Sequence, residues 1–161
     1  MSAEKKKQMG VLGLVIALVA VLVGSVLFVG AASGWFDDPK TVLDAEYHGE
    51  FEFLDLTADE YEELVAAKKS FVVFVDQNGC TTADRLRGYV SEWATEAGVK
   101  VYRMLFKEVE KSSLHDFVRF YPSVAVISRG KVTGFLRADS NDDAGAYNDF
   151  ATFKEWMGKY L

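Results

Sequence analysis

The sequence predicts an α/β domain with a mixed sheet between helices, preceded by one N-terminal transmembrane helix. Strand-like runs alternate with helical patterns from residue 50 to about residue 120, and a hairpin pattern and a last helix follow. Residues 8–36, by contrast, carry no charged side chain. The expected organisation is a cytoplasmic tail (1–8), a transmembrane signal anchor (9–34), a linker (35–49) and an extracytoplasmic domain (50–161).

The charge-free N-terminal segment is long enough to cross a bilayer. Its apolar part, residues 11–32, has 22 residues, and at about 1.5 Å per residue such a helix spans the roughly 30 Å hydrocarbon core. Three lysines (residues 5–7) precede it and two aspartates follow it closely. Lysines favour the cytoplasmic side, so we expect a single-pass protein of the cell membrane, held in lipid by residues 9–34, with its C-terminal domain extracytoplasmic. A cleaved secretory signal is the alternative, disfavoured because its apolar region spans only about 7–15 residues.

Composition excludes several classes of ligand. The chain has 18 Lys and Arg against 24 Asp and Glu, a formal net charge of -6. Binding phosphates requires clustered cations, so we expect no nucleic-acid partner.

One cysteine and two distant histidines provide neither an internal disulfide nor a metal cluster, and we expect no metal and no cofactor. The acidic loop 139–145 lacks the glycine and glutamate of an EF-hand and is interpreted as solvated.

The first elements of the domain follow from local patterns. Residues 49–56 alternate between apolar and acidic side chains, which predicts an edge strand. Thr57 and Glu60 have the spacing of a capping box, which predicts a helix from there to about residue 69. The continuous apolar run 71–75 is typical of a central strand. A helix should then run from residue 81 or 82 to about 97, where Gly98 ends it.

The second half completes the sheet. Residues 99–106 are predicted to form a strand, and residues 113–120 a short helix that runs through Phe117 and Phe120. Strands at 124–127 and 132–137, joined by a tight turn, predict a hairpin. Residues 138–149 are expected to form a loop, and the last helix (149–161) buries apolar side chains that include Phe153 and Trp156.

The order of these elements and three motifs resemble the thioredoxin-fold family. Cys80 follows the 71–75 strand and opens a helix, Tyr121-Pro122-Ser123 resembles the family's cis-proline loop, and the hairpin comes next. The resemblance covers about residues 50–161 and implies a thioredoxin-like three-layer α/β/α sandwich with a mixed sheet. It also implies a peptide groove at Tyr121, Pro122 and Ser123, where main-chain groups pair with an extended peptide.

The family's C-x-x-C motif reads Cys80-Thr81-Thr82-Ala83 here. A dithiol enzyme needs its second thiol to attack the mixed disulfide and release the substrate. We therefore expect no self-sufficient dithiol oxidoreductase. Three interpretations of Cys80 stay open: no redox role, a reactive monothiol whose thiolate the helix N-terminus stabilises, and an intermolecular Cys80–Cys80 disulfide that links two copies.

Charged residues near Cys80 have two interpretations each. Asp76, included in the candidate groove, could accept a proton from the thiol, but we favour a role in capping the turn at Asn78 and Gly79. Arg85 and Arg87 could raise the local positive potential, but we interpret them as solvated.

The sequence thus predicts a membrane-tethered, extracytoplasmic, thioredoxin-like domain that acts as a non-catalytic module for binding exported or membrane proteins. The alternative is a monothiol redox protein in which Cys80 forms mixed disulfides with exported proteins.

Overall fold

The computed structural model describes residues 40–161. The predicted tail, the predicted transmembrane helix and the first part of the predicted linker lie outside the described residues. Among residues 40–161, none of the helices has the length and apolar character that crossing a bilayer requires.

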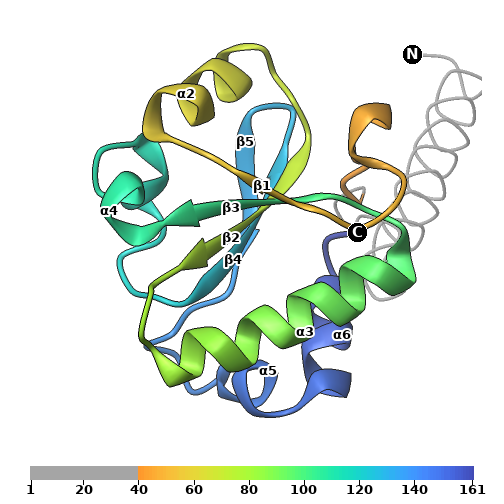
Figure 1. The fold of residues 1–161 in the computed structure, drawn as a ribbon, viewed down its shortest axis with the longest axis vertical. Coiled ribbons are helices and arrows are strands. Elements are labelled where there is room, and N and C mark those ends of the chain that lie inside the picture. Colours follow the sequence, from red (N-terminus) through yellow and green to blue (C-terminus); the bar gives the residue numbers. More distant parts are fainter. Residues whose placement is uncertain (1–39) are drawn as a thin grey trace, which may run out of the picture. The chain divides into compact units, whose positions relative to one another are not determined.

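A mixed sheet of five strands, ordered β1-β3-β2-β4-β5, forms the centre of the domain (Figure 1). Its strands are β1 (Phe53–Asp55), β2 (Phe71–Asp76), β3 (Val101–Leu105), β4 (Ser123–Ser128) and β5 (Lys131–Phe135). β1 and β2 both run parallel to β3, whereas β4 is antiparallel to β2 and β5 is antiparallel to β4. The mixed sheet and the hairpin are confirmed.

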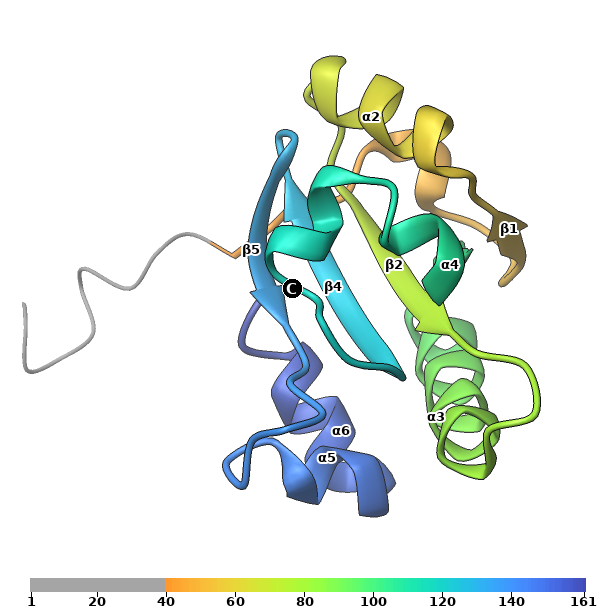
Figure 2. The ribbon, with the colours of Figure 1, turned by 90° about the vertical axis from the view of Figure 1, so that its left-hand side faces the viewer.

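Helices cover both faces of this sheet. Figures 1 and 2 show α2 and α4 on one side, and α3, α5 and α6 on the other. Their bounds are α2 (Ala58–Ala66), α3 (Thr81–Ala97), α4 (Phe106–Val109), α5 (Ala144–Asn148) and α6 (Phe150–Met157), with short 3-10 turns η1 (Ala45–Tyr47) and η2 (Ser113–Asp116). The three-layer arrangement is therefore confirmed.

The central strand β2 shows why its sequence is continuously apolar. Phe71 and Val73 face the layer of α2 and α4, whereas Val72 and Phe74 face the layer of α3 and α6. All four side chains are at most 1% exposed. A strand covered on both faces cannot alternate apolar with polar residues, because either face would then bury polar groups.

The caps of the two long helices match the sequence pattern. The Thr57 main-chain N–H donates to Glu60 Oε2 at 2.9 Å, and the Glu60 main-chain N–H donates to Thr57 Oγ1 at 3.4 Å, which completes the capping box at α2. Gly98 ends α3 at φ 64°, in the left-handed region that glycine adopts without strain.

The predicted linker 35–49 is wrong for residues 41–49. Leu43 and Tyr47 are 7% and 3% exposed and pack into the two core clusters. The main-chain N–H of Thr41 donates to the Tyr160 carbonyl, and that of Asp44 donates to the Ser70 carbonyl. These partners are distant in the sequence, so no local pattern indicates them. The domain therefore starts at about residue 40.

Several other boundaries also differ. The strand expected over 49–56 is reduced to β1, and the strand expected over 99–106 ends at Leu105, where α4 begins. The helix expected over 113–120 is only the 3-10 turn η2, and Phe117 and Phe120, which follow this turn, are exposed. The loop expected over 138–149 contains α5. Helices of four or five residues depend on tertiary contacts, which explains why periodicity did not indicate them.

Candidate functional site

Two of the motifs in the sequence meet at the end of the sheet where β2 ends and β4 begins (Figure 2). Val75 in β2 pairs with Ser123 in β4. The chain leaves β2 through residues 77–79 and enters α3 at Cys80. The Tyr121–Pro122 peptide bond, directly before β4, is cis. The cis-proline loop predicted from the sequence is therefore present beside the segment that leads to the cysteine.

Cys80 is the N-cap residue of α3, with φ -104° and ψ 115°, and its side chain makes no capping hydrogen bond. The thiol is free and partly exposed. Ala83, which stands where a second thiol would be needed, is fully buried. The chain has no other cysteine, so this helix end offers one sulfur only.

The cis-proline loop is fixed from beneath by hydroxyl groups. Tyr147 Oη lies 2.8 Å from the Pro122 carbonyl oxygen and 3.1 Å from that of Leu136. Burial, and then the charges of nearby aspartates, raise the pKa of Tyr147 above its ordinary value, so its hydroxyl stays a donor. Ser123, fully buried, donates from Oγ to the Leu136 carbonyl at 2.7 Å. Ser123 therefore supports the loop from inside the fold.

Asp76 has a different partner from either one expected. Its side chain is fully buried, and Arg87 Nη2 donates to Asp76 Oδ1 at 2.7 Å while Nε donates to Oδ2 at 3.2 Å. The Gln77 main-chain N–H donates to Oδ1 at 2.8 Å. This carboxylate raises the pKa of Arg87 further. The interpretation of Arg87 as solvated is wrong, because the pair joins the end of β2 to the second turn of α3.

Two other sequence candidates have structural partners. Arg85 Nη1 donates to Asn148 Oδ1 at 3.0 Å, which links α3 to the end of α5. In the acidic loop, the Arg137 guanidinium lies 3.6 Å from Asp142 and 3.5 Å from Asp143, so it offsets part of the charge of these carboxylates. Within residues 40–161, no group of three or more metal-ligating side chains is gathered.

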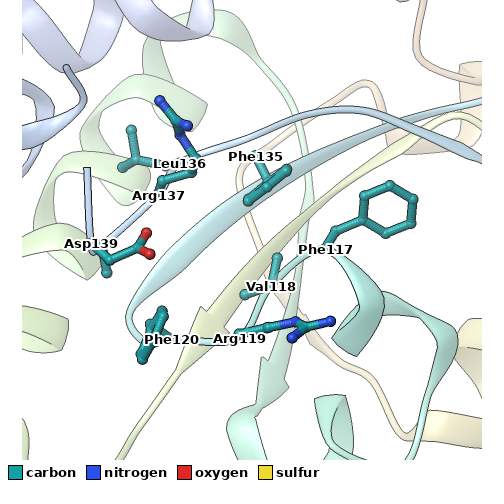
Figure 3. A pocket seen from close by; sticks show the side chains of 9 residues that line it. Phe117, Val118, Arg119, Phe120, Phe135, Leu136, Arg137 and Asp139 are labelled. Carbon is teal, nitrogen blue, oxygen red and sulfur yellow. The ribbon is translucent and has the colours of Figure 1, made fainter. Parts of the chain in front are cut away.

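A groove beside the cis-proline loop was missed by the sequence analysis. Among the described residues, the exposed large apolar side chains are Phe117 (46%), Phe120 (55%), Tyr121 (43%) and Val42 (81%), so three of the four lie in this loop. Figure 3 shows a groove that Phe117 and Phe120 border. This aromatic groove is lined by Phe117, Val118, Arg119, Phe120, Phe135, Leu136, Arg137, Ala138 and Asp139.

The sequence held no local signal for this exposure. Proline at position 122 disfavours helical geometry at Tyr121 only, whereas η2 already ends at Asp116. The main-chain groups of residues 119–121 form no hydrogen bond with other described residues. An exposed apolar surface beside unpaired main-chain groups can receive an extended peptide.

Comparison with solved structures places this fold among the thioredoxins. A point mutant of thioredoxin from Halobacterium salinarum NRC-1 matches at 14% identity and a TM-score of 0.50, over 69% of this chain and 90% of that one. The reduced Schistosoma mansoni thioredoxin pre-protein matches at 16% and 0.51, over 70% and 100%. Oxidised thioredoxin from Plasmodium falciparum matches at 14% and 0.51, over 68% and 98%.

The class of protein that the domain represents is therefore thioredoxin-like by fold. At these identities the similarity is one of fold alone. No protein-family model matches the chain, and no curated protein matches it.

Proposed function

We propose that the domain is a non-catalytic protein-interaction module, tethered to the membrane by residues 9–34, that binds an extended segment of an exported or membrane protein. The observation that carries this proposal is the exposure of Phe117, Phe120 and Tyr121 beside main-chain groups of residues 119–121 that have no hydrogen-bond partner among the described residues. Exposed aromatic side chains that line a groove, as Phe117 and Phe120 do, are typical of interaction surfaces.

The presence of one cysteine favours a protein that binds a partner over an enzyme that completes a thiol–disulfide cycle by itself. After Cys80 attacks a disulfide, release of the partner requires a second thiol, and the chain provides none. Binding through the aromatic groove needs no sulfur.

The tether is supported by the charge-free segment and by the lysines that precede it. Because residues 41–49 pack into the domain, this proposal leaves only residues 35–39 as the linker. So short a linker favours a partner that is itself held at the membrane surface.

Photo-crosslinking tests this function in the full-length chain. A photoreactive amino acid at position 121, in membranes of cells that express the protein, should capture the same partner in the wild-type background and in Cys80→Ala. The Phe117→Ala/Phe120→Ala variant should lose it, whereas Val42→Ala, which removes an exposed apolar side chain elsewhere, should retain it. Loss of the partner in Cys80→Ala, or its retention in the double phenylalanine variant, overturns the proposal.

The partial exposure of Cys80 at the start of α3 favours a second function, monothiol exchange. The Cys80 thiolate would attack a partner disulfide and form one S–S bond, while the partner's other sulfur leaves as a thiolate. An external thiol would then attack the mixed disulfide and return Cys80 to the reduced state. Under this function, mixed disulfides should accumulate on the full-length chain when external thiols are withdrawn, and Cys80→Ser should abolish them. A chain that forms no mixed disulfide contradicts it.

A further inference from the structure

We infer that the aromatic groove selects a segment in which one large apolar residue is flanked by an acidic residue on one side and a basic residue on the other. This inference rests on the proposed function, because it specifies the sequence that the same surface accepts.

The middle of the groove fits one apolar side chain. Its floor is formed by Val118 and Leu136, which are 2% and 1% exposed, and phenylalanine rings form its walls (Figure 3). It encloses about 130 Å³, whereas pockets for whole small molecules usually enclose about 300–1,000 Å³. The size and the apolar lining therefore suit a single phenylalanine or leucine side chain of a longer segment.

The two ends of the groove carry opposite charges. Figure 3 shows the Arg119 guanidinium directed toward Phe117, and Asp139 near Phe120 at the other end. Both Arg119 and Asp139 are exposed, and neither takes part in an ion pair among the described residues.

Arg137 also lines the groove, but two carboxylates of the acidic loop already neutralise it. One cation with two carboxylates leaves one net negative charge beside Asp139, so the groove has a cation at one end and an excess of negative charge at the other. Such a field attracts a segment with the complementary pair of charges, whereas a uniformly acidic or uniformly basic segment is repelled at one of the two ends.

The expected selectivity is modest, because both charges are exposed to solvent. An exposed ion pair is worth about a two- to five-fold change in affinity, and salt reduces it. The apolar side chain and the main-chain pairing at residues 119–121 provide the bulk of the affinity, while the charges choose between sequences.

Four fluorescent peptides with a central phenylalanine test this inference on the full-length chain in lipid nanodiscs. Their flanks are acidic and basic, both neutral, both acidic, or both basic. In fluorescence polarisation at low salt, the mixed-charge peptide should bind about four- to twenty-fold more tightly than the neutral one, the product of two such pairs. This advantage should fall toward one at 0.5 M salt.

Charge-neutralising variants should divide the effect between the two ends. Arg119→Gln should remove the gain from the acidic flank only, and Asp139→Asn the gain from the basic flank only, with the neutral peptide unchanged. Arg129→Gln, in the turn between β4 and β5, and Glu92→Gln, on the exposed face of α3, are the matched controls and should alter nothing.

The outcomes separate the two proposals. If the neutral peptide binds and the mixed-charge peptide binds no better, or if either variant changes all four peptides alike, the charge selection is wrong and the interaction function stands. If no peptide binds, including the neutral one, the proposed interaction function is overturned and the selection with it.

Discussion

Replacing Arg87 by methionine removes the main partner of a buried carboxylate. The Asp76 side chain is fully buried, and Arg87 approaches it with Nη2 at 2.7 Å and Nε at 3.2 Å. The remaining donor to this carboxylate is the main-chain N–H of Gln77. Arg87→Met keeps most of the length of the side chain, so the loss is chiefly one of charge and hydrogen bonds.

The magnitude follows from burial. Removing one partner of a buried ion pair costs about 3–5 kcal/mol, because the other charge is left without compensation. The Arg87 side chain is itself 30% exposed, so water can reach part of the space that it leaves. The decrease in the free energy of unfolding should therefore lie near the lower end of this range, at about 3 kcal/mol. In Asp76→Asn/Arg87→Met the buried charge is gone as well, and the double variant should be more stable than Arg87→Met by about 1–2 kcal/mol.

Urea unfolding of residues 40–161, followed by the fluorescence of Trp93 and Trp156, measures these differences in a double-mutant cycle. Arg85→Met is the matched control. It lies on the same helix but its guanidinium bonds only the exposed Asn148, so it should cost less than about 0.5 kcal/mol.

A second readout concerns the candidate site. The ion pair joins the end of β2 to α3, so its loss should loosen the start of that helix and speed the alkylation of Cys80. The reasoning would be refuted if Arg87→Met and Arg85→Met lowered the free energy of unfolding equally. A coupling energy near zero between positions 76 and 87 would refute it as well.

Three further predictions concern a cap, a pair of glycines and a buried phenol. Thr57→Ala removes the capping box and should lower the free energy of unfolding by about 1 kcal/mol in urea titrations. Hydrogen bonds from the main chain and then from the side chain of Thr57 lower the pKa of Glu60, and Thr57→Ala removes only the side-chain bond. The stabilisation from that bond is full above pH 4.5 and is lost as the pH falls through the lower folded value. A difference in stability between the two proteins that does not narrow in acid contradicts this. Gly130 has φ 74°, and a Cβ there would meet a main-chain carbonyl in α2, so Gly130→Ala should lower the free energy of unfolding by more than about 1 kcal/mol. Gly88 lies in open space on α3, so Gly88→Ala should raise it by about 0.5–1 kcal/mol. Thermal unfolding distinguishes the two signs. Burial raises the pKa of Tyr61 from 10.0 to about 12, so its contribution to stability is full below pH 10 and declines as the pH rises toward 12, and Tyr61→Phe should reduce that decline in alkaline unfolding curves.

The sequence indicated the elements whose signals are local. The capping box at Thr57, the apolar run of β2 and the glycine at the end of α3 each specify structure through neighbours within a few residues. The cis-proline loop was recognised for the same reason, since its motif is contiguous.

What the sequence did not indicate depends on contacts between distant segments. Tyr47 is buried because residues 41–49 dock against the end of the chain and the start of β2, although locally they look like a polar linker. Arg87 has the sequence environment of a solvated helix residue, and only the fold brings it to Asp76. The helix α5 contains a glycine and forms where Tyr147 reaches the Pro122 carbonyl, a contact made across 25 residues.

The aromatic groove is built from two segments that are distant in the sequence. One wall comes from residues 117–120, which precede Pro122, and the other from residues 135–139 at and after the end of β5. Neither segment alone predicts a binding surface. Folding has nonetheless left three aromatic side chains of this loop in water, although burying each fully would contribute about 1.5–3 kcal/mol. Exposure that forgoes such stabilisation, beside a helix end with one sulfur in place of two, is the reason for proposing that this end of the sheet binds another chain.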